Sequence, residues 1–398
     1  MRLRMYNVEF GDAFLLCGQR ENLLVDLGSI DPAVDFAPIQ RDIARESLEK
    51  EASLLLTHFH EDHWSGLRRQ PGGPFLPPFR VVYLPNLFGI RTPGKLDPVV
   101  SGLLGELLEA VVLDRALHFT LADLLREVLP SLDWGKVRFL QQGDMFSADG
   151  VNYRVLWPKR ESMARRMTGQ LREFLKQLDA LLLERGMERP LLEFLGDLAD
   201  LLLRDLAAYT GYQQQLDLWP YNGSSYEELY GQAQRASDIL RESFRTLNRE
   251  SRVWHQFRHY ADALKEDWNK LSIVFHNAES CEENLLMTGD VPSGVLDQIA
   301  LGKMKGVGFW RHYFAVKAPH HGTKSHFCPR LPDCRYICIS NGRGNRRYQR
   351  ITDWYEKTYG VGSRRAVLQC TNGRCEYLAR SSCPGCTALP PQACHTIP

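Results

Sequence analysis

The sequence predicts a mixed α/β fold that is interrupted by a large helical insertion. Short apolar runs that end in Gly or Asp recur over residues 1–157 and again over 269–378, which is typical of strands in a covered sheet. Between them, residues 160–268 carry leucines at helical spacing. With 398 residues, of which 44% are hydrophobic and 24% charged, the chain is in the globular range and can bury a large core.

The first strand-like segments follow one another closely. In order they read MRLRMYNV, AFLLCG, NLLVDLG and ASLLLTHFH, and the third contains Asp26 near its end. Further strands are predicted at RVVYLPN, VRFLQQGDMF and VNYRVLWP. A helix is predicted at 99–129, where leucines recur at helical spacing.

The central region has a different character. Two leucine-rich stripes at helical spacing lie on either side of Pro190, and Ser225 followed by Glu228 has the pattern of a capping box for a further helix. The stripes are accompanied by nearly balanced charges, which favours packing surface over a cofactor site. We expect residues 160–268 to form a helical lobe that caps or flanks the functional face of the strand-rich part.

Strand signals resume after the insertion at LSIVFH, NLLMTGD, YFAVKAPHHG and YICISNG, each of which ends in polar residues. The predicted organisation is therefore one discontinuous domain, 1–159 and 269–378, with the insertion 160–268 and a Cys-rich tail at 379–398.

The stretch LLLTHFHEDHWSGL places ligand-type residues directly after a buried-strand pattern. His58 and His60 are two positions apart, so on an extended segment they point the same way. Asp62 and His63 follow in the turn and can face a second ion. Four such residues at this spacing predict a metal site.

This pattern resembles the metallo-β-lactamase-fold hydrolases, and the resemblance implies an αββα sandwich with two divalent ions. His58 and His60 would serve the first ion, and Asp62 and His63 the second. Asp290 of LLMTGD would bridge the two ions, and APHHGT would supply the final ligand, His320, with the adjacent His321 as a supporting residue. Asp26 would support the site from behind. The ions would be Zn²⁺ or Mn²⁺, with Mg²⁺ as an alternative.

A closer resemblance is to the hydrolase domain of the DNA-uptake competence protein ComEC and its soluble relatives. The segments that carry it read TGD, HHGT and SNGRGN, in that order. It covers residues 1 to about 157 and 269–378. Many members of the fold have one more histidine, between the two metal motifs, and no convincing equivalent is present here; this leaves the first metal site weaker and the identity of its ion open.

Two ions roughly 3.5–4 Å apart lower the pKa of a shared water and neutralise the charge on a leaving oxygen. We predict that Asp62, His63 and Lys324 take part in this chemistry. Phosphodiesters suit such a centre, but a β-lactam or thioester would be served by the same ions, so the metal motif alone does not choose the substrate.

The C-terminal part of the chain is strongly basic. Residues 301–398 contain sixteen Lys and Arg against four Asp and Glu, a local balance of +12 that the overall charge of +1 conceals. Lys324 follows the His-His-Gly turn, and Arg343, Arg346 and Arg347 lie in a Gly-rich loop, where guanidinium groups can hold phosphate oxygens in pairs. We predict a phosphate-binding role for these four residues; a solvated basic face is the alternative.

The tail contains cysteines in a pattern that is compatible with a structural zinc site. Cys383 and Cys386 have the spacing of a zinc knuckle, and Cys370 and Cys375 complete a four-thiolate set, with Cys394 and His395 as alternatives to them. The other interpretation is that these thiols bind no metal.

No secretory segment and no membrane helix is visible in the sequence, and the ten cysteines suit a reducing compartment. We therefore expect a cytoplasmic protein with no membrane partner. Three functions remain open: a metal-dependent nuclease acting on DNA or RNA, a hydrolase of a small phosphodiester such as a cyclic nucleotide, and a subunit that binds a protein partner through its helical insertion. Relatives of this kind occur in bacterial conflict operons, which adds antiviral defence as a possible setting.

Overall fold

The computed structural model describes residues 2–68, 76–88, 94–159, 163–211, 223–245, 252–341, 355–360, 366–371 and 394–397. Its internal contacts divide the chain into two compact units. Unit 1 consists of Met1–Asn86, Glu127–Pro158 and Asn269–Pro398, and unit 2 of Leu87–Arg126 and Lys159–Trp268. Unit 1 contains two large sheets, whereas unit 2 is mainly helical.

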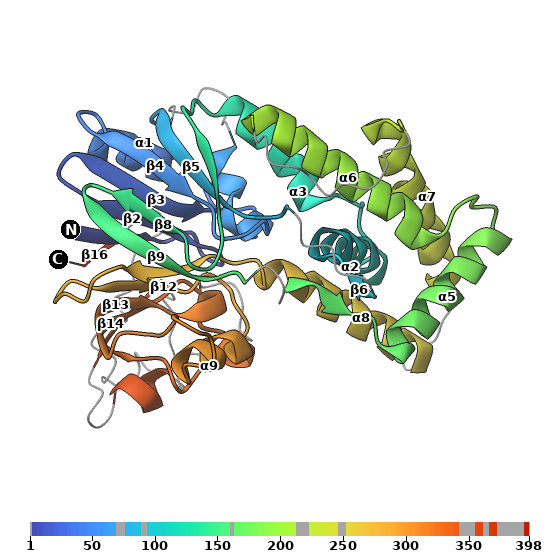
Figure 1. Ribbon diagram of the computed structural model, residues 1–398. Coiled ribbons are helices and arrows are strands. Elements are labelled where there is room, and N and C mark those ends of the chain that lie inside the picture. The colour runs from blue at the N-terminus through green and yellow to red at the C-terminus, as the bar shows by residue number, and fades with distance from the viewer. Residues whose placement is uncertain are drawn as a thin grey trace. The chain divides into compact units, whose positions relative to one another are not determined.

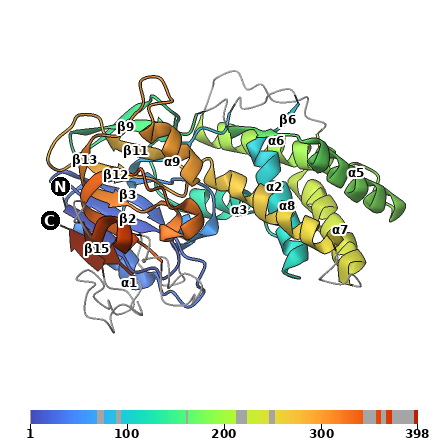
Figure 2. The ribbon, with the colours of Figure 1, turned by 90° about the horizontal axis from the view of Figure 1, so that it is seen from below.

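The first sheet of unit 1 has seven strands. In spatial order they are β16 (Cys394–Ile397), β1 (Arg2–Tyr6), β2 (Ala13–Cys17), β3 (Glu21–Leu27), β4 (Glu51–Leu55), β5 (Phe79–Pro85) and β7 (Val137–Leu140). The strands from β16 to β3 pair antiparallel, and those from β3 to β7 pair parallel. Figure 2 shows the two chain ends close together, in keeping with the pairing of β16 and β1. Because β3 and β4 are parallel neighbours, the loops after them leave from the same edge of the sheet.

The second sheet also has seven strands. In spatial order they are β15 (Val367–Cys370), β14 (Asp333–Ile339), β13 (His312–Lys317), β12 (Leu285–Met287), β11 (Val274–Asn277), β9 (Val151–Trp157) and β8 (Met145–Ala148). The strands from β15 to β12 pair parallel, and those from β12 to β8 pair antiparallel. The loops after β12 and β13 therefore also leave from one edge.

A shared apolar core joins the two sheets. Phe14 and Leu16 of β2 lie in it together with Tyr153 of β9 and Phe275 of β11. The two residues of β2 are two positions apart and so occupy the same face of their strand. Figure 1 shows the sheets as two adjacent layers, the first in blue and the second mainly in orange.

One helix covers the outer face of each sheet (Figure 1). Helix α1 (Ala37–Glu46) buries Ile39 and Ile43, and α9 (Ser293–Ala300) buries Leu296 and Ile299. Both helices therefore direct an apolar stripe toward a sheet and a polar stripe outward. The predicted α/β class and αββα layering are confirmed.

Unit 2 contains α2 (Pro98–Val112), α3 (Thr120–Asp123), α5 (Gly169–Glu184), α6 (Leu191–Thr210), α7 (Tyr226–Arg245) and α8 (Arg252–Asn269), together with the two-residue strands β6 (Lys95–Leu96) and β10 (Arg165–Arg166). The last residue of α8 belongs to unit 1. The predicted capping box is present, since the Glu228 amide donates to Ser225 Oγ at 3.1 Å before α7. None of the helices in the described part of the chain is long and apolar enough to span a membrane.

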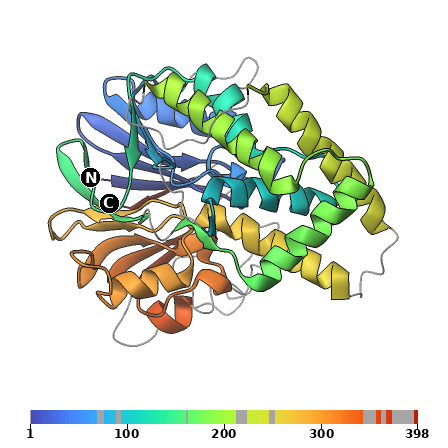
Figure 3. The same cartoon turned by 45° about the vertical axis from the view of Figure 1, so that its right-hand side comes forward.

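Helix α2 is the centre of unit 2. All of its residues except Glu109 and Val112 are buried, and it contacts both α6 and α7 (Figure 3). Its sequence has no continuous polar face, which is the pattern of a helix surrounded by others. The sequence alone assigns this segment to the part before the insertion, whereas the structure groups Leu87–Arg126 with the later helices.

Short helical turns complete the fold. They are η1 (Glu61–His63), η2 (Ser65–Leu67), η3 (Leu124–Val128), η4 (Leu129–Ser131), η5 (Pro319–Gly322), η6 (Lys324–His326) and η7 (Glu356–Gly360). Two of them, η1 and η5, follow strands β4 and β13; η1 carries His63, and η5 carries His320 and His321.

Candidate metal centre

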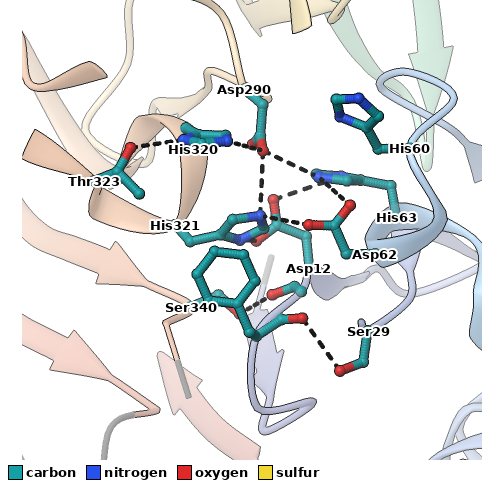
Figure 4. A network of polar contacts seen from close by, with 12 residues as sticks. Asp12, Ser29, His60, Asp62, His63, Asp290, His320, His321, Thr323 and Ser340 are labelled. Atoms are coloured by element: carbon teal, nitrogen blue, oxygen red, sulfur yellow. Dashed lines mark hydrogen bonds and ion pairs between the residues drawn. The ribbon is translucent and has the colours of Figure 1, made fainter. Parts of the chain in front are cut away.

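Residues at the ends of two pairs of parallel strands, β3 with β4 and β12 with β13, meet at one place in unit 1 (Figure 4). The first sheet contributes Asp26 at the end of β3 and the motif that begins at His58 after β4. The second sheet contributes Asp290 after β12 and the His-His pair of η5 after β13. The apolar strands bury the sheet interior, and the polar side chains begin where the strands end.

Asp26 fixes the start of the histidine motif. Its carboxylate accepts hydrogen bonds from the amide and the hydroxyl of Thr57, both at 2.7 Å. The same carboxylate lies 2.8 Å from Nδ1 of His63. Since Nδ1 is held on this side, Nε2 of His63 points to Asp290, whose Oδ2 is 3.2 Å away. A carboxylate behind an imidazole orients the ring and raises its basicity, as is common for metal-binding histidines.

His58 and His60 lie on one side of this arrangement. Nε2 of His58 is 3.0 Å from Nδ1 of His60, and the ring of His58 lies 4.1 Å from that of His63 between centroids. Asp62 lies on the other side, where its Oδ2 is 3.1 Å from Nε2 of His321. All of these side chains are buried or nearly so.

Two close backbone approaches hold the motif in place. A Cβ atom on Gly11 would lie 2.1 Å from the carbonyl oxygen of Gly28 and 2.8 Å from that of Asp62. A Cβ atom on Gly28 would lie 2.5 Å from the amide nitrogen of His63. Only glycine fits at these positions, because the two loops pack directly on the backbone of η1.

The His-His turn has an unusual backbone. His320 and His321 both have positive φ, 46° and 54°, which is uncommon for residues other than glycine and costs free energy that the surrounding structure must offset. The turn directs the two rings differently. Nε2 of His321 is 3.2 Å from Asp290 Oδ2, whereas Nε2 of His320 is 3.9 Å from the same oxygen. Nδ1 of His320 lies 2.6 Å from the hydroxyl of Thr323.

The sequence predicted His320 as the final metal ligand and His321 as a supporting residue. The structure brings both to the centre, but it places His321 between Asp62 and Asp290 and leaves His320 nearer the rim, with about a fifth of its side chain exposed. The geometry therefore favours the second histidine of the pair as a ligand.

Two further buried residues of the centre were not recognised from the sequence. Asp12, in the turn before β2, is completely buried, and its Oδ1 lies 3.3 Å from Nδ1 of His321. Lys317, the last residue of β13, is 3% exposed and contacts both Asp12 and Asp290. A usable signal was present, because a lysine inside the apolar run YFAVKAP requires a buried anionic partner.

The carboxylates determine the protonation of the imidazoles. Burial lowers the pKa of His63, but the carboxylates of Asp290 and Asp26 outweigh burial and raise that pKa to about 10. Burial likewise opposes the charge on His321, and Asp290 and Asp12 raise its pKa well above the usual value. A divalent cation bound by these nitrogens would therefore displace protons.

The charges of the other members follow the same pattern. Burial alone would raise the pKa of Asp290, but Lys317 and His321 hold it well below the usual value. The pKa of His58 is lowered well below its usual value by burial and by the charge on His63. The lowered pKa leaves His58 neutral, whereas His63 and His321 would first have to release their protons to a bound cation.

Four groups of three side chains in the described residues could hold a metal ion, with ligand atoms within 4.8 Å of one another. They are His58, His63 and Asp290; Asp62, His63 and His321; Asp12, Asp290 and His321; and Asp12, Asp26 and His63. Imidazole nitrogens and carboxylate oxygens are ligands that Zn²⁺ and Mn²⁺ accept. The residues present therefore fit divalent cations.

The remaining predicted site residues lie elsewhere or outside the described part of the chain. Lys324, in η6, is exposed. Arg343, Arg346 and Arg347 lie outside the described residues, and so do Cys375, Cys383 and Cys386. Cys370 ends β15, and Cys394 and His395 begin β16, but the positions of their side chains are not described.

Comparisons with known proteins give the following result. No protein-family model matches this chain, and no curated protein matches it. Among solved structures, the chain is similar to MEM-A1, a subclass B3 metallo-β-lactamase from a soil metagenome library, with 15% identity, coverage of 42% of this chain and 56% of that one, and a TM-score of 0.24. It thus spans little more than half of that protein.

Two further structures are similar at comparable levels. The metallo-β-lactamase SMB-1, bound to 2-mercaptoethanesulfonate, is 13% identical over 61% of this chain and 91% of that one, with a TM-score of 0.24. An archaeal metallo-β-lactamase superfamily protein from Sulfolobus tokodaii is 14% identical over 60% of this chain and 98% of that one, with a TM-score of 0.22.

Proposed function

We propose that this protein is a metal-dependent phosphodiester hydrolase that acts on nucleic acid. The observation that carries the proposal is the position of Asp290. Its Oδ2 lies 3.2 Å from Nε2 of His63 and 3.2 Å from Nε2 of His321, so a single carboxylate oxygen faces both the histidine-motif side and the His321 side of the centre. A shared carboxylate is the arrangement expected where two cations lie close together.

Bound divalent ions would act as Lewis acids and would activate a water molecule at neutral pH. The residues of this chain orient the groups that take part. Asp26 holds His63 from behind, with Nε2 facing Asp290. Asp62 and His321 face each other at 3.1 Å on the opposite side. Since these side chains are buried and hydrogen-bonded to neighbouring loops, little reorganisation would be needed during a reaction.

A phosphodiester substrate is supported by the basic C-terminal part and by the resemblance to the ComEC hydrolase domain. Residues 301–398 carry the local charge of +12, and this part includes η5 and η6. Lys324 is exposed and lies four positions after His320, the partly exposed histidine of the pair. An exposed lysine near a metal centre can contact a phosphate, whereas a β-lactam or thioester substrate lacks the repeated phosphate charges that a basic excess would attract.

The test begins with protein that has been stripped of metal and then supplied with Mn²⁺, Zn²⁺ or Mg²⁺. Labelled single-stranded DNA, double-stranded DNA and RNA are the substrates, together with a cyclic dinucleotide and a chromogenic β-lactam. Asp290→Asn is the inactive control. Metal-dependent cleavage of a polynucleotide that the control lacks would support the proposal. Turnover of the cyclic dinucleotide alone would move the substrate to small phosphodiesters, and turnover of the β-lactam alone would overturn it.

A further inference from the structure

Lys317 is a buried cation in the wall of the candidate centre. Its ammonium donates to Asp290 Oδ1 and to the carbonyl oxygen of Gly289, both at 2.8 Å, and lies 2.5 Å from Asp12 Oδ2. An ammonium group has three protons to donate, and three acceptors surround this one. Two hydrogen bonds and an ion pair thus hold the side chain at a fixed place on the second sheet.

The ammonium occupies the same carboxylates that one of the candidate metal groups would use. Asp12, Asp290 and His321 together could hold an ion, but Lys317 already contacts the first two. A divalent cation and an ammonium repel each other at such distances in a buried site. Binding of an ion to this group is therefore opposed by the charge of Lys317 unless the lysine moves away.

The lysine also determines which atoms remain available. Because Oδ1 of Asp290 is held by Lys317, Oδ2 faces Nε2 of His63 and of His321, each at 3.2 Å. Asp12 is held through Oδ2, and its Oδ1 lies 3.3 Å from Nδ1 of His321. The carboxylate of Asp12 therefore faces Nδ1 of His321, just as the carboxylate of Asp26 faces Nδ1 of His63.

We propose that Lys317 is a built-in monovalent cation of the centre, which closes the Asp12, Asp290 and His321 group to metal ions and positions Asp290 and His321 for the ions on the other side. This rests on the metal-dependent function proposed above. In this arrangement divalent ions bind only on the side of the centre that is lined by His58, His63 and Asp62. Lys317 is a positioning residue, since it acts through Asp290 and Asp12.

The test counts metal ions and does not depend on hydrolysis. Wild type, Lys317→Met, Lys317→Arg and the double variant Lys317→Met with Asp12→Asn are equilibrated with Mn²⁺ at one buffered free concentration, and bound metal is measured by mass spectrometry. We expect Lys317→Met to bind about one more equivalent than wild type, because two carboxylates lose their counter-charge. Lys317→Arg should keep the wild-type number, and the double variant should return to it.

A second measurement covers the case in which Lys317→Met does not fold. Crystals of the wild-type protein soaked in Mn²⁺ are examined by anomalous scattering. The proposal predicts peaks only on the side of His58, His63 and Asp62. A peak between Asp12 and His321 would overturn it, and so would a folded Lys317→Met protein with unchanged metal content. If metal binds as predicted but no phosphodiester is cleaved, the proposed function fails and this inference stands.

Discussion

Both units of this protein bury carboxylates, but they surround them differently. In unit 1, the carboxylates of the centre face imidazole nitrogens and one ammonium group. In unit 2, Glu106 accepts from the hydroxyl of Thr120 and from Nε1 of Trp268. Asp267 accepts from the hydroxyl of Ser101 and from the guanidinium of Arg165.

The two units differ in whether the nitrogen groups that contact the carboxylates can also bind a metal ion. Indole and guanidinium nitrogens only donate hydrogen bonds, so Trp268 and Arg165 fix the carboxylates of unit 2 without offering a lone pair to a metal. Imidazole has a lone pair once it loses a proton, so the cluster of unit 1 can exchange protons for a cation. The burial and charge of a carboxylate alone therefore do not identify a metal site. Neighbouring imidazole nitrogens, whose lone pairs can bind a cation, do.

The largest expected effect is the loss of metal from unit 1. Asp290→Asn removes the charge that both halves of the centre share, and we expect metal affinity to fall by more than the roughly 10–100-fold that loss of a supporting residue produces. Asp267→Asn is the matched control, since it changes an equally buried carboxylate in unit 2 and should leave metal content unchanged. Metal analysis of the two folded variants checks this. Equal metal content would show that Asp290 is not a ligand.

Breaking an ion pair in unit 2 should reduce stability without affecting metal. Arg165 pairs with Asp267, whose side chain is completely buried. Arg165→Met leaves that carboxylate without its main cationic partner, and such a loss typically costs roughly 3–5 kcal/mol of unfolding free energy. Urea unfolding followed by circular dichroism measures the change, with Arg172→Met on the exposed face of α5 as control. An unchanged midpoint for Arg165→Met would contradict the predicted role of the pair.

Glu106 should make unit 2 sensitive to pH. Burial raises the pKa of its carboxyl from 4.5 to about 7, although the Thr120 hydroxyl opposes this. Between these values the folded protein binds one more proton than the unfolded chain, so stability falls as pH rises from about 4.5 to about 7, by roughly 3 kcal/mol in total.

The comparison of wild type with Glu106→Gln isolates this contribution, because the amide does not titrate. Unfolding free energies at pH 5, 6, 7 and 8 should fall with pH in wild type more steeply than in the variant. Parallel curves for the two proteins would show that Glu106 has an ordinary pKa in the folded state.

The smallest expected effect concerns the exposed basic residues. If Lys324 contacts a phosphate, Lys324→Ala should weaken nucleic-acid binding at all sequences and reduce the log–log salt slope by about one unit. Lys176→Ala, an exposed lysine on α5, is the control. Binding of metal-free protein to a labelled oligonucleotide at several salt concentrations measures both. Equal slopes for the two variants would favour a solvated basic face.

Much of the fold could be predicted from the sequence, because strand ends in unit 1 coincide with local signals. Asp26, the histidine motif and the Gly-Asp at 289–290 each follow an apolar run, and His63 contacts both Asp26 and Asp290. The leucine stripes on either side of Pro190 form α5 and α6. These features depend on residues near one another in the chain.

What could not be predicted depends on contacts distant in sequence or on backbone geometry. The choice between His320 and His321 follows from two positive φ angles that no local residue preference indicates. Asp12 and Lys317 are 305 positions apart, so their pairing is visible only after the two sheets have packed. The all-round burial of α2 likewise required the later helices to be in place.

We infer that His321, the second histidine of the pair, completes the metal centre from its buried position between Asp62 and Asp290. Titration of metal-free protein with Co²⁺, followed by absorption and by metal analysis, tests it on His321→Ala and His320→Ala side by side. We predict that His321→Ala loses at least one equivalent of bound metal, whereas His320→Ala, whose ring lies 3.9 Å from Asp290, keeps the wild-type content. Full metal binding by His321→Ala, together with loss in His320→Ala, would contradict the account.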